Sequence, residues 1–114
     1  MSFKRADVVL VRFPNSDLKT YKNRPALIVQ TDGLNTGLPQ KIIALITSNL
    51  SRTGQTRVPV QKNSKLGRHM GIISDSVIVA DNLATILERE IDKVIGNCVE
   101  TEHVDQALRR VLAL

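Results

Sequence analysis

The chain has one cysteine and very few aromatic residues, and both shortages exclude classes of protein. Cys98 has no second cysteine to pair with, so a disulfide framework is excluded, and no metal-ligand spacing surrounds it. The aromatic residues are only Phe3, Phe13 and Tyr21, too few for a binder that stacks many bases on rings. Apolar runs are too short to span a bilayer, and the basic N-terminus lacks the apolar core of a signal peptide. We therefore expect a single cytoplasmic domain without a metal or other cofactor and without membrane contact.

Acidic residues are also scarce, and their distribution is uneven. The 114 residues carry 16 Lys and Arg against 11 Asp and Glu, a net charge of +5. Residues 41–70 contain no acidic residue, whereas most carboxylates of the C-terminal part lie in 81–105. This pattern indicates a basic face suited to a polyanion such as nucleic acid, although a basic balance of this size is common in small domains.

Short β-branched runs separated by turn residues predict a mainly β fold. We expect strands at 7–13, 25–31, 41–47, 56–60 and 75–80, with a further strand at 82–87. Pro59 cannot donate to a ladder, so 56–60 is predicted to be an edge strand. Residues 14–23, 48–56 and 63–71 are predicted to be exposed loops, and 94–99 is ambiguous.

The C-terminal segment has the spacing of an amphipathic helix. Its apolar residues recur at i, i+3, i+4, i+7 and i+8, namely Val104, Ala107, Leu108, Val111 and Leu112. Thr101 is placed to cap this helix, and basic residues stand at its C-terminal end, where the helix dipole favours them. The fold class is therefore α+β or a small barrel with a terminal helix.

Two residues far apart in the sequence are candidates for one site. Arg24 precedes an apolar strand and is followed by Pro25, which restricts the backbone on both sides of that bond. Thr47 ends the next strand, so antiparallel pairing of the two strands would bring Arg24 and Thr47 to one pocket. A guanidinium stabilises anionic oxygens, and a hydroxyl donates to them.

Each of these residues also has an ordinary structural interpretation. Arg24 alone is a loop arginine ahead of a strand, and Thr47-Ser48-Asn49 alone is a turn whose side chains bond to local backbone groups. The Asp81-Asn82 pair is typical of a turn, with hydrogen bonding to a base edge as the less common alternative. No catalytic triad, carboxylate pair, phosphate loop or zinc-ligand pattern is present in the sequence.

The order of these motifs resembles that of the PemK/MazF family of bacterial toxins. The motifs are Asp-Val-Val-Leu-Val, Asn-Arg-Pro-Ala-Leu-Ile-Val, Ile-Thr-Ser and Ser-Val-Ile-Val-Ala-Asp-Asn-Leu-Ala-Thr-Ile, followed by the amphipathic helix. The resemblance implies an SH3-like small barrel of the CcdB-like plasmid-maintenance type with a C-terminal helix. It also implies a cytoplasmic bacterial endoribonuclease that forms a homodimer, cleaves single-stranded RNA without a metal, and is blocked by the acidic tail of a cognate antitoxin.

Carried over by position, the resemblance makes Arg24 and Thr47 the catalytic residues. The expected contacts to RNA come from the flanking loops and strand ends: Lys19, Lys22, Asn23, Ser48, Arg52 and Asp81. The cleavage it implies is attack of a 2′-hydroxyl on the adjacent phosphorus, which leaves a 2′,3′-cyclic phosphate and a 5′-hydroxyl. Two alternatives stay open: a toxin of the same fold that binds a protein such as DNA gyrase, and a plain nucleic-acid-binding module.

Overall fold

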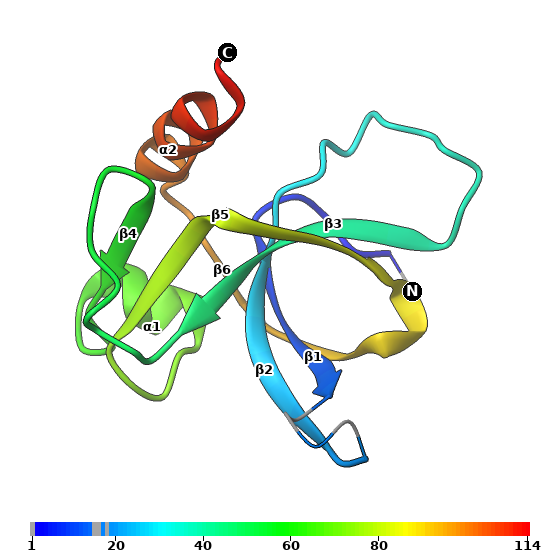
Figure 1. The fold of residues 1–114 in the computed structure, drawn as a ribbon, viewed down its shortest axis with the longest axis horizontal. Coiled ribbons are helices and arrows are strands. Elements are labelled where there is room, and N and C mark those ends of the chain that lie inside the picture. Colours follow the sequence, from blue (N-terminus) through cyan, green and yellow to red (C-terminus); the bar gives the residue numbers. More distant parts are fainter. Residues whose placement is uncertain (1, 15–16, 18) are drawn as a thin grey trace.

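The computed structural model describes residues 2–14, 17 and 19–114, without the side chains of Phe13 and Pro14. One antiparallel sheet, in the order β4-β5-β3-β2-β1-β6, forms most of the molecule (Figure 1). The strands are β1 (Asp7–Pro14), β2 (Tyr21–Ile28), β3 (Gln40–Thr47), β4 (Arg57–Val60), β5 (Ser76–Leu87) and β6 (Ile91–Asn97). The helices are α1 (Lys65–Met70), the 3-10 helix η1 (Glu88–Glu90) and α2 (Glu102–Leu112). The predicted class, mainly β with a C-terminal helix, is confirmed.

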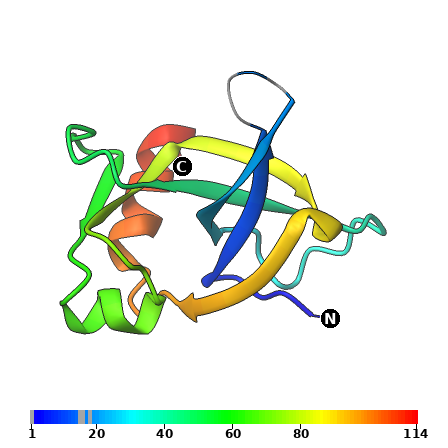
Figure 2. The ribbon, with the colours of Figure 1, turned by 90° about the horizontal axis from the view of Figure 1, so that it is seen from below.

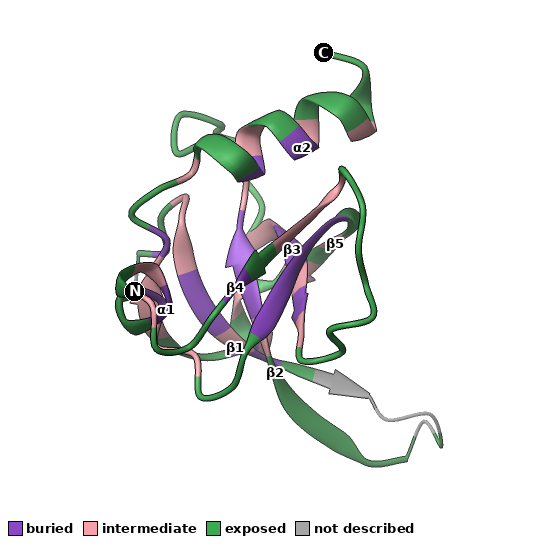
Figure 3. Ribbon diagram, turned by 90° about the vertical axis from the view of Figure 1, so that its left-hand side faces the viewer, coloured by how far each residue is buried: buried purple, intermediate pink, exposed green. Residues whose placement is uncertain are grey.

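The sheet buries side chains on both of its faces, which explains the nearly continuous apolar strands. In β1, Val8 belongs to one buried cluster with Met70 of α1 and Val104 of α2, on the face that the helices cover. Val9 belongs to a second buried cluster on the opposite, concave face, together with Phe3. Because successive residues of a strand point to opposite faces, a strand buried on both faces is apolar at every position. Figure 3 shows this burial along the central strands.

The strongly curved sheet does not close into a complete barrel. Its two edges are β4 and β6, and within the described residues no ladder joins them. Figure 2 shows the strands curving around the concave face while α2 lies on the other side of the sheet. The expected small barrel is therefore an open one, whose β4 edge is short and contains Pro59, as predicted for an edge strand.

The second strand starts earlier than the sequence predicted. β2 begins at Tyr21, and its polar first half pairs with β1, with Arg24 opposite Val11. Arg24 is thus inside the strand rather than ahead of it, and Pro25 lies in the strand as well. Pro25 is tolerated because pairing of β2 with β3 begins only at Ala26, so no ladder bond is required from residue 25 on that side.

The prediction of a loop at 63–71 was wrong, because a short helix occupies most of it. Ser64 caps α1 by accepting a hydrogen bond from the Gly67 backbone N–H at 2.9 Å. Gly67 and Met70 are buried, and Gly71 ends the helix at φ 72°. A Cβ on Gly67 would collide with the Gln61 carbonyl, so the glycine is required by packing. The helix is too short for a periodic apolar stripe, and its sequence is therefore typical of a loop.

Residues 75–80 and 82–87 form one strand rather than two. In β5, the partner of Leu45 is Val79 and the partner of Ala44 is Leu83, so Ala80, Asp81 and Asn82 form a bulge. The predicted Asp81-Asn82 turn is therefore wrong, and the pair lies in an irregular part of a long strand. The ambiguous segment 94–99 is largely β6, where two further register shifts interrupt the pairing with β1.

The C-terminal helix is confirmed, and it begins directly after Thr101 as predicted. Val104 and Ala107 are buried against the sheet, whereas Leu112 at the end of the stripe is exposed. The Thr101 hydroxyl contacts the Asp105 carboxylate at 3.3 Å instead of bonding to a backbone N–H. Neither α1 nor α2, in the part of the chain that the structure describes, has the length and apolar character needed to cross a membrane.

Cys98 is a buried residue of the core, and we predict that it is chemically inert in the folded protein. Its side chain is 1% exposed, and burial raises the pKa of its thiol, so little reactive thiolate forms at neutral pH. A thiol reagent should leave Cys98 unmodified in native buffer and modify it fully in denaturant, as intact mass measures. Rapid modification of the native protein would contradict this packing.

Candidate active site

The ladder between β2 and β3 runs toward Arg24 and Thr47 and ends two residues before them. The paired residues are Ala26 with Leu45 and Leu27 with Ala44, so each step back along β2 is a step forward along β3. If this register is continued by two residues beyond the last observed pair, Ala26 and Leu45, it reaches Arg24 on β2 and Thr47 on β3. The two strands are thus antiparallel, as the sequence analysis expected, and Arg24 and Thr47 lie just beyond the observed pairs.

Arg24 and Thr47 also line one cavity of about 400 Å³. Its apolar walls come from four strands and from the segment after α1, and its polar groups lie on β2, β3 and β6 and in the segment 74–76. The lining residues are Leu10, Lys22, Asn23, Arg24, Pro25, Ile46, Thr47, Ser48, Gly71, Ile72, Ile73, Ser74, Ser76, Lys93 and Ile95. Five of the eight predicted site residues are therefore brought together. A concave apolar site with a few polar groups is typical of ligand binding.

Arg24 is exposed, and its guanidinium has no hydrogen-bond or ion-pair partner among residues 2–14, 17 and 19–114. Other arginines differ in this respect. Arg5 bonds to Asp105 at 2.8 Å, Arg57 bonds to Asp81 at 3.0 Å, and Arg12 lies over the ring of Tyr21 at 4.3 Å. The fork of Arg24 is therefore available to an anionic group that enters the cavity.

The hydroxyl of Thr47 is oriented by the turn that follows β3. Its Oγ1 accepts a hydrogen bond from the Asn49 backbone N–H at 3.1 Å, as the turn interpretation expected. Because a hydroxyl is both an acceptor and a donor, this bond leaves the proton of Thr47 free to point elsewhere. The local turn and a donor role toward the cavity are thus compatible.

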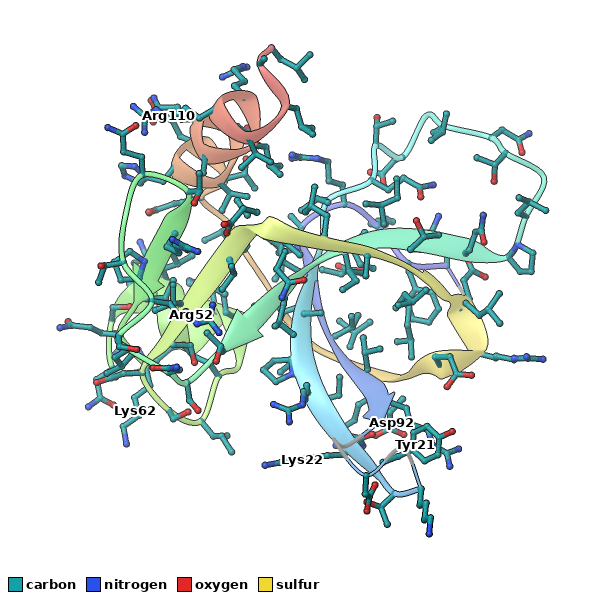
Figure 4. All side chains as sticks on the ribbon, in the orientation of Figure 1. Tyr21, Lys22, Arg52, Lys62, Asp92 and Arg110 are labelled. Atoms are coloured by element: carbon teal, nitrogen blue, oxygen red, sulfur yellow. The ribbon has the colours of Figure 1, made fainter. Side chains whose placement is uncertain are left out.

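Lys93 is a cavity residue that the sequence did not single out. It lies in β6 opposite Leu10 of β1, at one of the irregular positions of that ladder. Figure 4 shows Lys22, on β2 of the same cavity, extending outward from its strand. The two lysines place positive charge beside Arg24, which raises the local concentration of polyanions. No motif marks Lys93, because its position depends on β1 and β6 pairing across most of the chain.

The other three predicted residues lie outside this cavity. Lys19 lies in the turn before β2, where its backbone N–H and that of Thr20 donate to the Asp17 carboxylate. These bonds hold the pKa of Asp17 below its usual value. Arg52 lines a separate cavity near β4, the region where Figure 4 places it. Asp81 is bonded to Arg57 at 3.0 Å in a partly exposed ion pair. A role for Lys19, Arg52 and Asp81 toward RNA stays a prediction.

Within the described part of the chain, no group of three His, Cys, Asp or Glu side chains is arranged to hold a metal ion. His69 is exposed on α1, and His103 is exposed in the first turn of α2. Neither histidine belongs to the cavity of Arg24 and Thr47.

The fold and this cavity define a small basic domain: a curved sheet has helices on one face, and an exposed arginine lines the same cavity as a strand-end hydroxyl. The chain belongs to the family of PemK-like, MazF-like toxins of type II toxin–antitoxin systems, whose family model matches residues 4–114. A comparison with curated proteins gives no match.

Solved structures with the same fold are toxins of this kind. An endoribonuclease in complex with its cognate antitoxin from Mycobacterial species is 21% identical, with a TM-score of 0.74 over 99% of this chain and 97% of that chain. The Mycobacterium tuberculosis toxin MazF-mt6 is 24% identical, with a TM-score of 0.73 over 95% and 97%. MazF in a MazE-MazF complex from Deinococcus radiodurans is 16% identical, with a TM-score of 0.73 over 100% and 98%. At these identities the likeness establishes the fold.

Proposed function

We propose that this toxin is a metal-independent endoribonuclease that cleaves single-stranded RNA at selected sites. The 2′-hydroxyl of one nucleotide attacks the adjacent phosphorus, the bond to the 5′-oxygen of the next nucleotide breaks, and a 2′,3′-cyclic phosphate and a 5′-hydroxyl result. The proton of the 2′-hydroxyl leaves to solvent or a base, and the departing oxygen gains a proton. Negative charge accumulates on the non-bridging phosphate oxygens during this step.

The observation that carries the proposal is the shared cavity of Arg24 and Thr47. Arg24 carries a guanidinium that is unpaired in the described structure, so it neutralises the developing charge without first breaking another bond. Thr47 donates its hydroxyl proton to the same phosphate while Asn49 holds its oxygen in place. Lys22 and Lys93 bind neighbouring phosphates of the strand.

The proposal includes the partners and the compartment of such a toxin. The substrate is messenger RNA in the bacterial cytoplasm, the working unit is a homodimer, and a cognate antitoxin inhibits it by laying an acidic segment along the RNA path. In support, two of the similar structures are complexes with an antitoxin, and the cavity is lined by Lys22, Arg24 and Lys93, which have no acidic partner in the part of the chain that the structure describes.

Incubation of the purified protein with long single-stranded RNA in excess EDTA tests the function. We expect discrete fragments whose new ends carry a 2′,3′-cyclic phosphate and a 5′-hydroxyl, as end mapping by ligation and sequencing measures. Intact RNA in EDTA and in Mg²⁺ would contradict the proposal. If the same preparation then recovered a topoisomerase from lysate, it would favour the alternative of a protein-binding toxin.

Replacement of Thr47 tests whether its hydroxyl group is needed for cleavage. Thr47→Ser keeps both the donor and the acceptor and should retain most activity, whereas Thr47→Val should lower the cleavage rate about 100-fold, the loss typical of one preorganised donor. The matched control is Thr85→Val, an exposed β5 threonine outside the cavity, which should cleave as the native protein does. Equal rates for Thr47→Val and Thr85→Val in a single-turnover assay would remove Thr47 from the mechanism.

A further inference from the structure

Arg24 also lines a second cavity. It has a volume of about 250 Å³ and is lined by Arg24, Ile43, Leu45, Asn82 and Ala84. Ile43 belongs to the buried cluster of the concave face and Ala84 packs against it, whereas Ile46 in the first cavity belongs to the cluster of the helix-covered face. The apolar side chains that β3 gives to the two cavities therefore come from different faces of that strand, and Arg24 is the residue that the cavities share.

The β5 bulge places Asn82 at this second cavity. Ala80 donates its backbone N–H to the Thr56 carbonyl at 2.9 Å, and Asp81 is bonded to Arg57, so both residues are tied to the β4 side. Asn82 follows them, is exposed, and its amide has no hydrogen-bond partner among the residues that the structure describes. The bulge thus presents a free donor and acceptor beside the apolar side chains of Ile43 and Leu45.

We propose that this second cavity binds one nucleobase next to the scissile phosphate and that Asn82 determines which base is accepted. The inference rests on the proposed RNA cleavage. A phosphate held by Arg24 has one nucleoside on each side, and Arg24 lines both cavities, so each cavity is within reach of one of the two nucleosides. The smaller cavity is below the size typical of drug-like ligands and suits a single heterocycle stacked on an apolar floor. An amide pairs with a base edge that offers a donor and an acceptor side by side.

Two substitutions of Asn82 separate base selection from general RNA affinity. Asn82→Ala removes both hydrogen-bonding groups, and Asn82→Asp keeps two acceptors but no donor, which favours a base edge with two adjacent donors, such as that of guanine. Asn63→Asp is the matched control, because Asn63 is exposed, lies before α1 and lines neither cavity. It adds the same charge without touching the proposed subsite.

The test sequences the RNA ends produced by each variant from one transcript pool and counts the base at each position around the cut. We expect Asn82→Ala to lower the preference at one adjacent position about tenfold, and Asn82→Asp to change the preferred base there. Asn63→Asp should keep the native preferences. Cleavage by Asn82→Ala and Asn82→Asp with native base frequencies would overturn the inference and leave the nuclease intact.

A binding assay keeps the two proposals distinguishable if the native protein cuts no RNA. Fluorescence anisotropy with short single-stranded DNA, in which one position is varied through four bases, measures base preference without a 2′-hydroxyl. A native preference that Asn82→Ala abolishes supports the base subsite although the nuclease proposal has failed. Equal affinity for all four bases at every position, or a preference unchanged in Asn82→Ala, overturns the subsite.

Discussion

Arg24→Ala should lower the rate of RNA cleavage about 100- to 1000-fold, the loss typical of one preorganised donor to a developing oxyanion. Among the described residues, Arg24 is the only cation that lines both cavities. Its guanidinium forms no ion pair with any of these residues, so it is available to a phosphate. Arg24→Lys keeps the charge but loses the planar fork, so we expect only partial activity. The measurement is the single-turnover rate constant on a defined RNA substrate.

The control for Arg24 is Arg89→Ala. The Arg89 side chain is 80% exposed in η1 and lines neither cavity, so its removal subtracts the same charge from the molecule without touching the site. Both variants should have the native free energy of unfolding. An equal loss of activity in Arg24→Ala and Arg89→Ala would mean that net charge alone matters, and it would contradict the proposed role of Arg24.

Gly71→Ala should lower the free energy of unfolding by roughly 2–5 kcal/mol, the sum of backbone strain and overpacking. Gly71 ends α1 at φ 72°, where a side chain is disfavoured, and its Cβ would collide with the Ile95 carbonyl of β6. Since Gly71 and Ile95 both line the larger cavity, the surviving folded molecules should also cleave RNA more slowly. Urea denaturation and the cleavage assay measure the two effects.

Two other glycines separate the backbone cost from the collision. Gly37 has the same φ of 72° but open space where a Cβ would lie, so Gly37→Ala should cost only about 1–2 kcal/mol. Gly33 has neither a positive φ nor a close neighbour, so Gly33→Ala should leave the stability nearly unchanged. If Gly71→Ala were no more destabilising than Gly37→Ala, the close packing of α1 on β6 would be wrong.

The central strands and α2 were predictable from the sequence because the spacing of their apolar residues follows which side chains are buried. Val8 and Val9 point into different buried clusters, and this two-sided burial produces the unbroken apolar run that was recognised as a strand. Val104 and Ala107 likewise show the helical spacing of a buried stripe. In each case one segment carries enough of its own pattern to be recognised without its partners.

The elements that were missed depend on partners elsewhere in the chain. The start of β2 at Tyr21 is polar and is held by pairing with β1, and α1 is defined by a Ser64 cap and a buried glycine rather than by a stripe. The site residues divide in the same way, into those placed by adjacent strands and those placed by distant parts of the chain. Arg24 and Thr47 follow from antiparallel pairing of two adjacent strands, whereas Lys93 depends on the pairing of β6. The Asp81-Asn82 pair was noticed as a turn with base-edge bonding as an alternative, but the bulge that holds it is encoded by no local pattern.

A structure of the protein with a single-stranded oligonucleotide that carries a 2′-deoxy nucleotide at the scissile position tests the central claim most directly. We expect the Arg24 guanidinium and the Thr47 Oγ1 both to lie about 3 Å from oxygens of the same phosphate. A bound oligonucleotide whose phosphates contact Arg24 and Thr47 separately, or contact neither residue, would contradict it.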